Sequence, residues 1–167
     1  MKKNIFLTAF IATSLMTGFS YIISSKQKKK FEEPEILGQL LHRLSPKINK
    51  ENAMIAGWLM HYSIGIVFVI VYELLFKKYK LKRNFITGFY IGALSGLLAI
   101  IIWHATLKLH PNPPSVDLKK YYIVLMAAHI LFGIDAITTL NARTKRMRNE
   151  NSQLEYNRRF INSKAFL

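Results

Sequence analysis

Residues 84–107 read NFITGFYIGALSGLLAIIIWHATL, and none of these 24 side chains is charged. An α-helix rises about 1.5 Å per residue, so about 20 apolar residues cross the hydrocarbon core of a bilayer, which is about 30 Å thick. The stretch is therefore long enough to span a membrane, and it predicts a transmembrane helix.

Three further stretches have the same character. Residues 4–25 and 53–72 carry no charge, and residues 121–141 carry only Asp135. A soluble core formed by 167 residues is too small to bury four such helices. The lack of Cys excludes a disulfide scaffold, and 51% hydrophobic residues exclude a disordered chain. The sequence predicts an all-α, four-helix transmembrane bundle that forms a single membrane domain, with spans of about 4–25, 53–76, 84–107 and 121–141.

The net charge of +15 lies between and beyond these spans. With four spans, the N-terminus, residues 77–83 and the basic tail 142–167 share one side, which carries 14 Lys and Arg against 10 on the other. Lys and Arg are enriched in cytoplasmic segments, so we expect both termini in the cytoplasm and the chain in the inner membrane of a bacterium. The basic run 26–30 opposes this topology. The first stretch resembles a signal peptide, but Lys26 is a poor cleavage context, and we expect an uncleaved span.

The position of the charge also predicts the partners. Basic residues that flank spans contact anionic head groups, so the charge predicts membrane lipids and no nucleic acid. The run RTKRMR at 143–148 is a candidate for docking onto lipid or a second protein. We also expect self-association or a membrane-protein partner.

An internal repeat is visible at an offset of 79 residues. FLTAF at 6–10 corresponds to FITGF at 85–89, and small residues then coincide at steps of four, namely Ala9, Thr13 and Thr17 with Gly88, Gly92 and Gly96. Small residues along one helix face allow close helix packing in lipid. The second and fourth stretches also match, because each has His-x-x-x-Gly about nine residues in. The pattern predicts two helical hairpins related as parallel repeats.

The order of these features resembles the YagU-like family of small bacterial inner-membrane proteins. The resemblance covers about residues 60–148 and rests on features in this order: His61 followed by IVF at 66–68 and Tyr72, the basic turn ending at 80–81, Gly88 and GAL at 92–94, His104, PPxxDL at 113–118, HIxFG at 129–133 and the basic tail. It implies a four-span inner-membrane protein and brings no established reaction.

The ionisable residues inside the spans are candidates for function, because such groups are costly in a membrane. Asp135 is predicted in the inner half, either as a proton or cation site or as a packing residue that is hydrogen-bonded to Thr138, to Thr139 or to a small polar residue on another helix. His61 and His129 are predicted at similar depth in the outer half. They are candidates for a proton relay, for ligand contact, for helix packing, or for haem b, with Gly65 and Gly133 making room for the macrocycle.

His104, beside Trp103, is the fourth candidate for ligand or proton binding, and a cluster with the other two imidazoles in the outer half is one hypothesis for it. Three His side chains suggest a metal, but spacing across helices is not visible in a sequence, and we predict no metal site. Glu73 is expected to pair with Lys77 at the membrane interface.

The sequence also predicts the structure of two segments that connect the spans. Residues 33–44 have an apolar helical stripe after a Pro, and they predict a short amphipathic helix that lies on the membrane surface or plugs the bundle. The loop 110–117 contains three Pro and is expected as a rigid turn, with Asp117 capping the fourth helix, or as a lid over the His residues.

The sequence contains no Gly-rich phosphate loop, no serine-nucleophile turn and no His-Glu-x-x-His motif. We therefore predict a non-enzymatic, multi-pass membrane protein that responds to protons or binds a small ligand through its intramembrane His and Asp residues. The alternatives are a haem b redox protein and a small oligomeric transporter or channel. A membrane enzyme acting on lipid is a further alternative.

Overall fold

The computed structural model describes residues 2–29 and 31–164 of the chain, and all regular structure in this part is helical. The five helices are α1 (Lys2–Gln27), α2 (Glu33–Leu44), α3 (Lys50–Tyr79), α4 (Phe85–Leu109) and α5 (Leu118–Lys164). Four of them are long and apolar enough to cross a membrane, at Ile5–Gln27, Lys50–Tyr79, Phe85–Leu109 and Leu118–Tyr156. The predicted all-α fold with four candidate spans is confirmed.

Capping residues determine where α3 begins and ends and where α4 begins. Asn49 and Asn84 precede α3 and α4, and each side-chain carbonyl accepts a hydrogen bond from the backbone N–H three residues on. Lys80 ends α3 in the left-handed conformation with φ of 50°, which reverses the chain within a few residues. The basic segment 77–83 is therefore the end of one helix and a tight turn.

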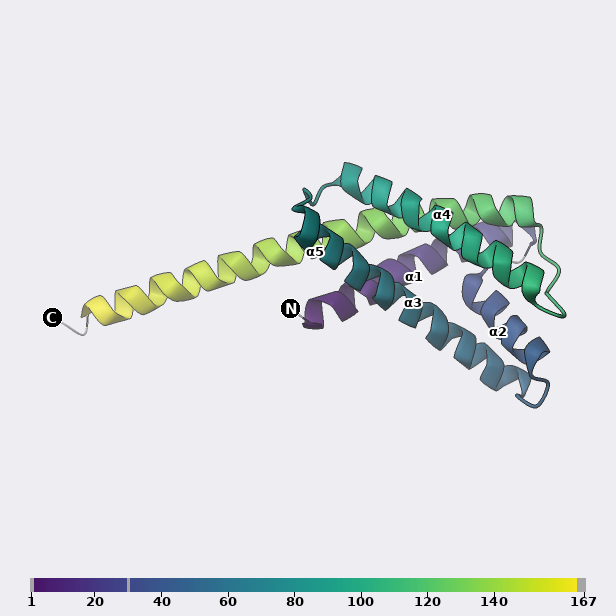
Figure 1. Ribbon diagram of the computed structural model, residues 1–167. Coiled ribbons are helices and arrows are strands. Elements are labelled where there is room, and N and C mark those ends of the chain that lie inside the picture. The colour runs from purple at the N-terminus through teal and green to yellow at the C-terminus, as the bar shows by residue number, and fades with distance from the viewer. Residues whose placement is uncertain (1, 30, 165–167) are drawn as a thin grey trace.

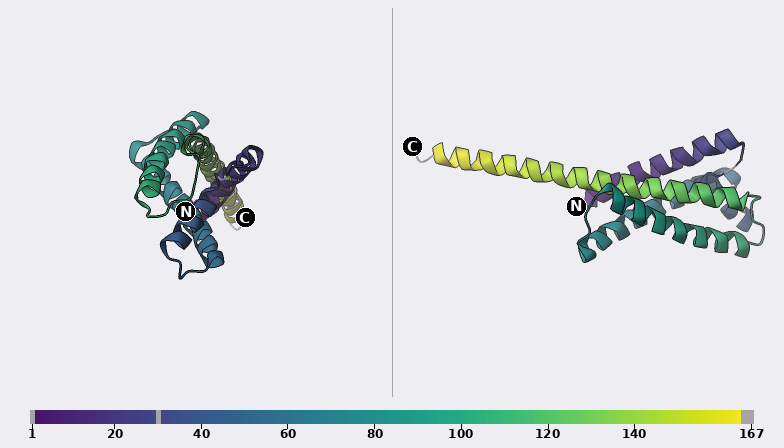
Figure 2. Two further views of the ribbon diagram at one scale, coloured as in Figure 1. Left: turned by 90° about the vertical axis from the view of Figure 1, so that its right-hand side faces the viewer. Right: turned by 90° about the horizontal axis from the view of Figure 1, so that it is seen from above.

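The two ends of the bundle differ (Figures 1 and 2). One end carries α2 together with the loops that connect α1 to α2 and α4 to α5, and we call it the α2 end. The other end carries the N-terminus and the turn between α3 and α4, and α5 projects beyond it, so we call it the tail end. The helix α5 continues to Lys164, beyond the predicted span end at 141, because residues 134–164 contain no Gly or Pro.

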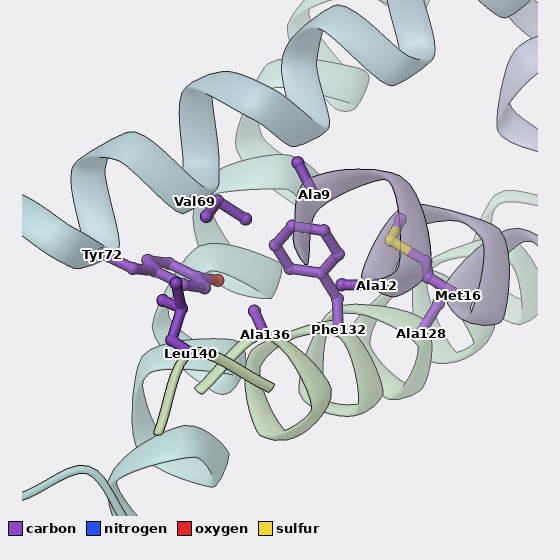
Figure 3. Packing of buried hydrophobic residues seen from close by; sticks show 9 residues of the cluster. All are labelled: Ala9, Ala12, Met16, Val69, Tyr72, Ala128, Phe132, Ala136 and Leu140. Atoms are coloured by element: carbon purple, nitrogen blue, oxygen red, sulfur yellow. The ribbon is translucent and has the colours of Figure 1, made fainter. Parts of the chain in front are cut away.

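The core near the middle of the bundle is formed by α1, α3 and α5 (Figure 3). Phe132 of α5 lies toward Val69 and Ala9, and its ring contacts Tyr72 with 5.9 Å between centroids. The other members are Ala12, Met16, Ala128, Ala136 and Leu140. Outside this core, large apolar side chains cover the surfaces of α3 and α4, such as Leu59 and Ile101, which are 65% and 66% exposed. Such a surface suits a surrounding of acyl chains.

Small residues set the distance between the helices. A Cβ added to Gly92 of α4 would lie 2.6 Å from the carbonyl oxygen of His129, so only Gly fits there. Gly88 and Gly96 also face α5. On α1, Thr13 fills the space beside Gly65 of α3. Ala9 and Thr17 are buried, so the small-residue faces of α1 and α4 lie in helix contacts.

The helix α2 plugs the α2 end of the bundle and does not lie free on a surface. It packs onto α3, where a Cβ on Gly57 would lie 2.5 Å from the backbone nitrogen of Gly38. Ile36 and Leu40 are buried in a second core with α4 and α5, as the predicted apolar stripe requires. The short amphipathic helix predicted in the first loop is confirmed, and it serves as the plug.

The loop 110–117 holds α2 in place. Arg43 donates to the carbonyl of Pro113 at 2.8 Å, and His110 Nε2 donates to the carbonyl of Leu40 at 3.0 Å. Asp117 accepts from the backbone N–H of Lys120 at the start of α5, so the predicted cap is confirmed. Asp117 also pairs with Lys29, and that hydrogen bond lowers the pKa of its carboxyl.

Candidate functional site

A cavity of about 200 Å³ lies between α3 and α4 on the side of the α2 end. Toward the tail end the two helices are joined, because the Tyr72 hydroxyl donates to Ser95 Oγ at 2.7 Å while Ser95 donates to the carbonyl of Gly92. Figure 1 shows α3 and α4 farther apart near α2 than at the turn that joins them. The cavity is lined by Thr13 and Met16 of α1, Glu33 and Leu37 of α2, His61, Ile64, Gly65 and Phe68 of α3, Ala99, Ile102, Trp103 and Thr106 of α4, and His129 and Phe132 of α5.

The cavity opens sideways, toward the space that acyl chains would fill. Ile64 of α3 and Ile102 of α4 line it from opposite sides, and they are 44% and 53% exposed. Thr106 of α4 is also exposed, and the other lining residues are buried or half-buried. A lipid-soluble molecule can therefore reach the cavity from within the membrane plane, without crossing the polar ends of the bundle.

His61 is fixed on the wall of the cavity by α1. Its Nε2 lies 2.9 Å from Thr17 Oγ1, and that hydroxyl donates its single proton to the carbonyl of Thr13 at 2.7 Å. A hydroxyl whose proton is used in this way can only accept from the ring, so the network assigns the proton of a neutral His61 to Nε2. The second ring nitrogen, Nδ1, is then an acceptor.

His129 has the opposite tautomer. Its Nδ1 lies 2.9 Å from the carbonyl oxygen of Leu125 one turn earlier in α5, and a carbonyl only accepts, so Nδ1 carries the proton. The edge-to-face contact with Phe68, with 5.8 Å between ring centroids, fixes the plane of the imidazole. The remaining nitrogen, Nε2, is an acceptor.

Each imidazole therefore has one ring nitrogen that carries no proton. Among the described residues, neither His61 Nδ1 nor His129 Nε2 has a hydrogen-bond partner. Both residues line the cavity, so these two acceptor nitrogens belong to side chains of its wall. The site offers two hydrogen-bond acceptors in apolar surroundings.

Glu33 is the third ionisable side chain that lines the cavity, and the sequence reasoning did not assign it a role. Ser20 donates to its Oε1 at 3.1 Å, and its Oε2 is buried without a partner in the described part of the chain. Burial raises the pKa of this carboxyl to about 7. The helical spacing could have indicated its burial. Glu33 lies three and seven residues before Ile36 and Leu40, so it shares their buried face of the helix.

His104 does not join the other two imidazoles, and the hypothesis of such a cluster is wrong. It is exposed on α4, and its Nδ1 lies 3.1 Å from the hydroxyl of Tyr122. Its neighbour Trp103 lines the cavity instead. Within residues 2–29 and 31–164, no three His, Cys, Asp or Glu side chains lie close enough to hold a metal ion.

Asp135 lies outside the cavity, on the half of α5 nearer the tail end. The expected bond from Thr138 is not formed, because that hydroxyl donates to the backbone carbonyls of Ile134 and Asp135. The carboxylate oxygen Oδ2 is buried without a partner among the described residues.

Glu73 forms the predicted interface ion pair. Its carboxylate lies 3.7 Å from Lys77 Nζ and 2.7 Å from Arg83 Nη2. The closer partner comes from the turn that follows α3, so Glu73 connects α3 to this turn. These ion pairs account for Glu73, so we assign it no role in ligand binding.

The loop 110–117 is not the lid of the cavity. The cavity is closed at this end by Glu33 and Leu37 of α2, and the loop only holds α2 from behind. The expectation that this loop forms a lid over the His residues is therefore wrong.

The site does not fit a haem held by two His side chains. Gly65 and Gly133 were expected to make room for the macrocycle, but Thr13 fills the space beside Gly65, and a Cβ on Gly133 would lie 2.6 Å from the Cα atom of Gly92. The volume of about 200 Å³ is also below the about 300–1,000 Å³ that is common for drug-sized ligands.

Comparison of the chain with protein-family models, with curated proteins and with solved structures finds no match. The resemblance to the YagU-like family thus stays a prediction.

Proposed function

We propose that this chain is a non-enzymatic, multi-pass protein of a bacterial cytoplasmic membrane, related to the YagU-like family, which binds a small lipid-soluble ligand in the cavity between α3 and α4. The observation that carries the proposal is the pair of buried imidazoles, His61 and His129, which both line the cavity and each of which has one nitrogen bonded within the protein and the other without a partner among the described residues. Buried polar groups without partners are costly, so a ligand that satisfies them gains affinity.

The proposed topology places the tail end in the cytoplasm and the cavity in the outer half of the membrane. The support is the distribution of Lys and Arg, of which 14 of 24 lie at the tail end. Because the chain has no Cys, single-Cys variants give a clean test. In intact spheroplasts, a membrane-impermeant maleimide is expected to label Asn112→Cys and to leave Lys82→Cys unlabelled, and the reverse pattern would contradict the topology.

Native mass spectrometry of the full-length chain tests the binding. We expect the protein extracted in mild detergent to retain a lipid-soluble molecule. Ala99→Phe places a ring in the cavity and is expected to abolish this adduct, since Ala99 is a buried lining residue. The matched control is Leu94→Phe on the same helix, where the side chain is 66% exposed, and it is expected to retain the adduct. A wild-type chain without an adduct, or an adduct unaffected by Ala99→Phe, would refute the proposal.

A further inference from the structure

We propose that the ligand presents a ring-sized head with a hydroxyl group to the cavity, in the manner of a lipid-soluble phenol, while the rest of the molecule passes between Ile64 and Ile102 into the acyl chains. This inference rests on the proposed ligand binding and names the chemical class. It follows from the size of the cavity, from its hydrogen-bonding groups and from its walls.

The size of the cavity selects the head of the ligand. A protein cavity of about 150 Å³ accommodates benzene, so about 200 Å³ accommodates a six-membered ring with one or two substituents. A larger molecule must leave part of itself outside. The opening beside Ile64 and Ile102 leads to the lipid side, so this part lies among acyl chains.

The hydrogen-bonding groups select a donor without a negative charge. His61 Nδ1 and His129 Nε2 are both acceptors, so the ligand must supply a proton on oxygen or nitrogen. None of the lining residues is Lys or Arg, so a carboxylate or phosphate would enter an apolar space without a cation. The buried carboxyl of Glu33 adds a further reason, because in its ionised form it would repel an anion.

The walls favour an aromatic ring over a flexible chain. Phe68 contacts the rings of both His129 and Phe132 edge to face, with centroid distances of 5.8 and 6.2 Å. Trp103 lines the opposite wall on α4. Rings arranged in this way form a rigid, flat-sided space, and an aromatic ligand gains further edge-to-face contacts there.

Trp103 allows a direct test of the proposal. The chain has two Trp, and Trp58→Phe leaves Trp103 as the only one while it keeps a ring for the stacking contacts of position 58 with Tyr21 and Tyr62. The full-length variant is placed in vesicles of phosphatidylcholine and phosphatidylglycerol. Bromine quenches Trp fluorescence at short range, so 4-bromophenol serves as the probe, with 4-bromoanisole lacking the donor and 4-bromobenzoate carrying a negative charge.

We expect 4-bromophenol to quench Trp103 with saturation, and the other two probes to bind at least about fivefold more weakly, as the loss of a hydrogen bond implies. His129→Leu, or His129→Gln if the former does not fold, is expected to remove this difference between phenol and anisole. The matched control is His104→Leu, which removes an exposed His from outside the cavity and is expected to retain it.

Two outcomes would overturn the inference, and only the second would also refute the proposed function. Saturable quenching of equal strength by phenol and anisole, or tighter binding of the benzoate, refutes the hydroxyl-bearing head and leaves the proposed ligand binding intact. Quenching that rises linearly for all three probes, and that Ala99→Phe does not change, refutes the inference and the proposed function together.

Discussion

Glu33 alone is expected to contribute a loss of stability as the pH rises from 5 to 8, and replacement of Glu33 by Gln is expected to remove this contribution. Burial raises the pKa of this carboxyl from 4.5 to about 7 in the folded chain. Between these values the folded protein keeps the proton and the unfolded chain has released it, so folding becomes less favourable as the pH rises, and the loss is complete above about pH 7. At about 1.4 kcal/mol per unit of pH, the free energy of unfolding falls by about 3 kcal/mol.

Thermal unfolding of the full-length chain in detergent at pH 5, 6, 7 and 8 measures this effect. A change of 1 kcal/mol shifts Tm by about 2–4 °C in a protein of this size, so the wild-type Tm is expected to fall by roughly 6–12 °C more than that of Glu33→Gln. Glu51→Gln makes the same change of charge at an exposed position and is expected to behave as wild type. An equal fall of Tm in Glu33→Gln and wild type would refute the argument.

Three further predictions concern packing, tautomers and the ties at the α2 end. Gly92→Ala is expected to reduce the free energy of unfolding by about 1–3 kcal/mol because its Cβ would meet the backbone of α5, whereas Gly18→Ala, with no atom within 4 Å, is expected to leave it unreduced in chemical unfolding. Thr17→Val is expected to change the ¹⁵N chemical shifts of the His61 ring, since Nε2 loses the oxygen to which it donates, and unchanged shifts would contradict the assigned tautomer. Asp117→Asn is expected to lower Tm at pH 7 and to converge with wild type at low pH, where the carboxylate is protonated in both states, as a pH series of Tm would show.

The four spans could be predicted because hydrophobic length is a property of each segment alone. The short helix at 33–44 was equally accessible, since Ile36 and Leu40 repeat at helical spacing after Pro34. The extension of α5 to Lys164 was not predicted, although the lack of Gly and Pro after residue 133 permits it. The spans and the short helix could be predicted from local sequence patterns. The extension of α5 was missed because this polar segment has no apolar stripe that would indicate a helix.

The site was only partly predictable, because it depends on which faces of different helices meet. The sequence predicted His61 and His129 at similar depth, and they do line one cavity. His104 was grouped with them by depth, but the inward-facing side of α4 continues through Ala99 and Trp103, and His104 lies one residue, or about 100°, away from it. Depth follows from residue number, while facing direction requires knowledge of the neighbour.

The uninterrupted course of α5 has a mechanical consequence. His129 and Lys164 lie in one helix and are separated by 35 residues, or about 50 Å along its axis. A rigid rod of this length acts as a lever, so a tilt of about 5° at the imidazole displaces the far end by about 4 Å. Whatever rearranges the bundle around His129 would thereby be amplified at a basic rod that projects past the tail end.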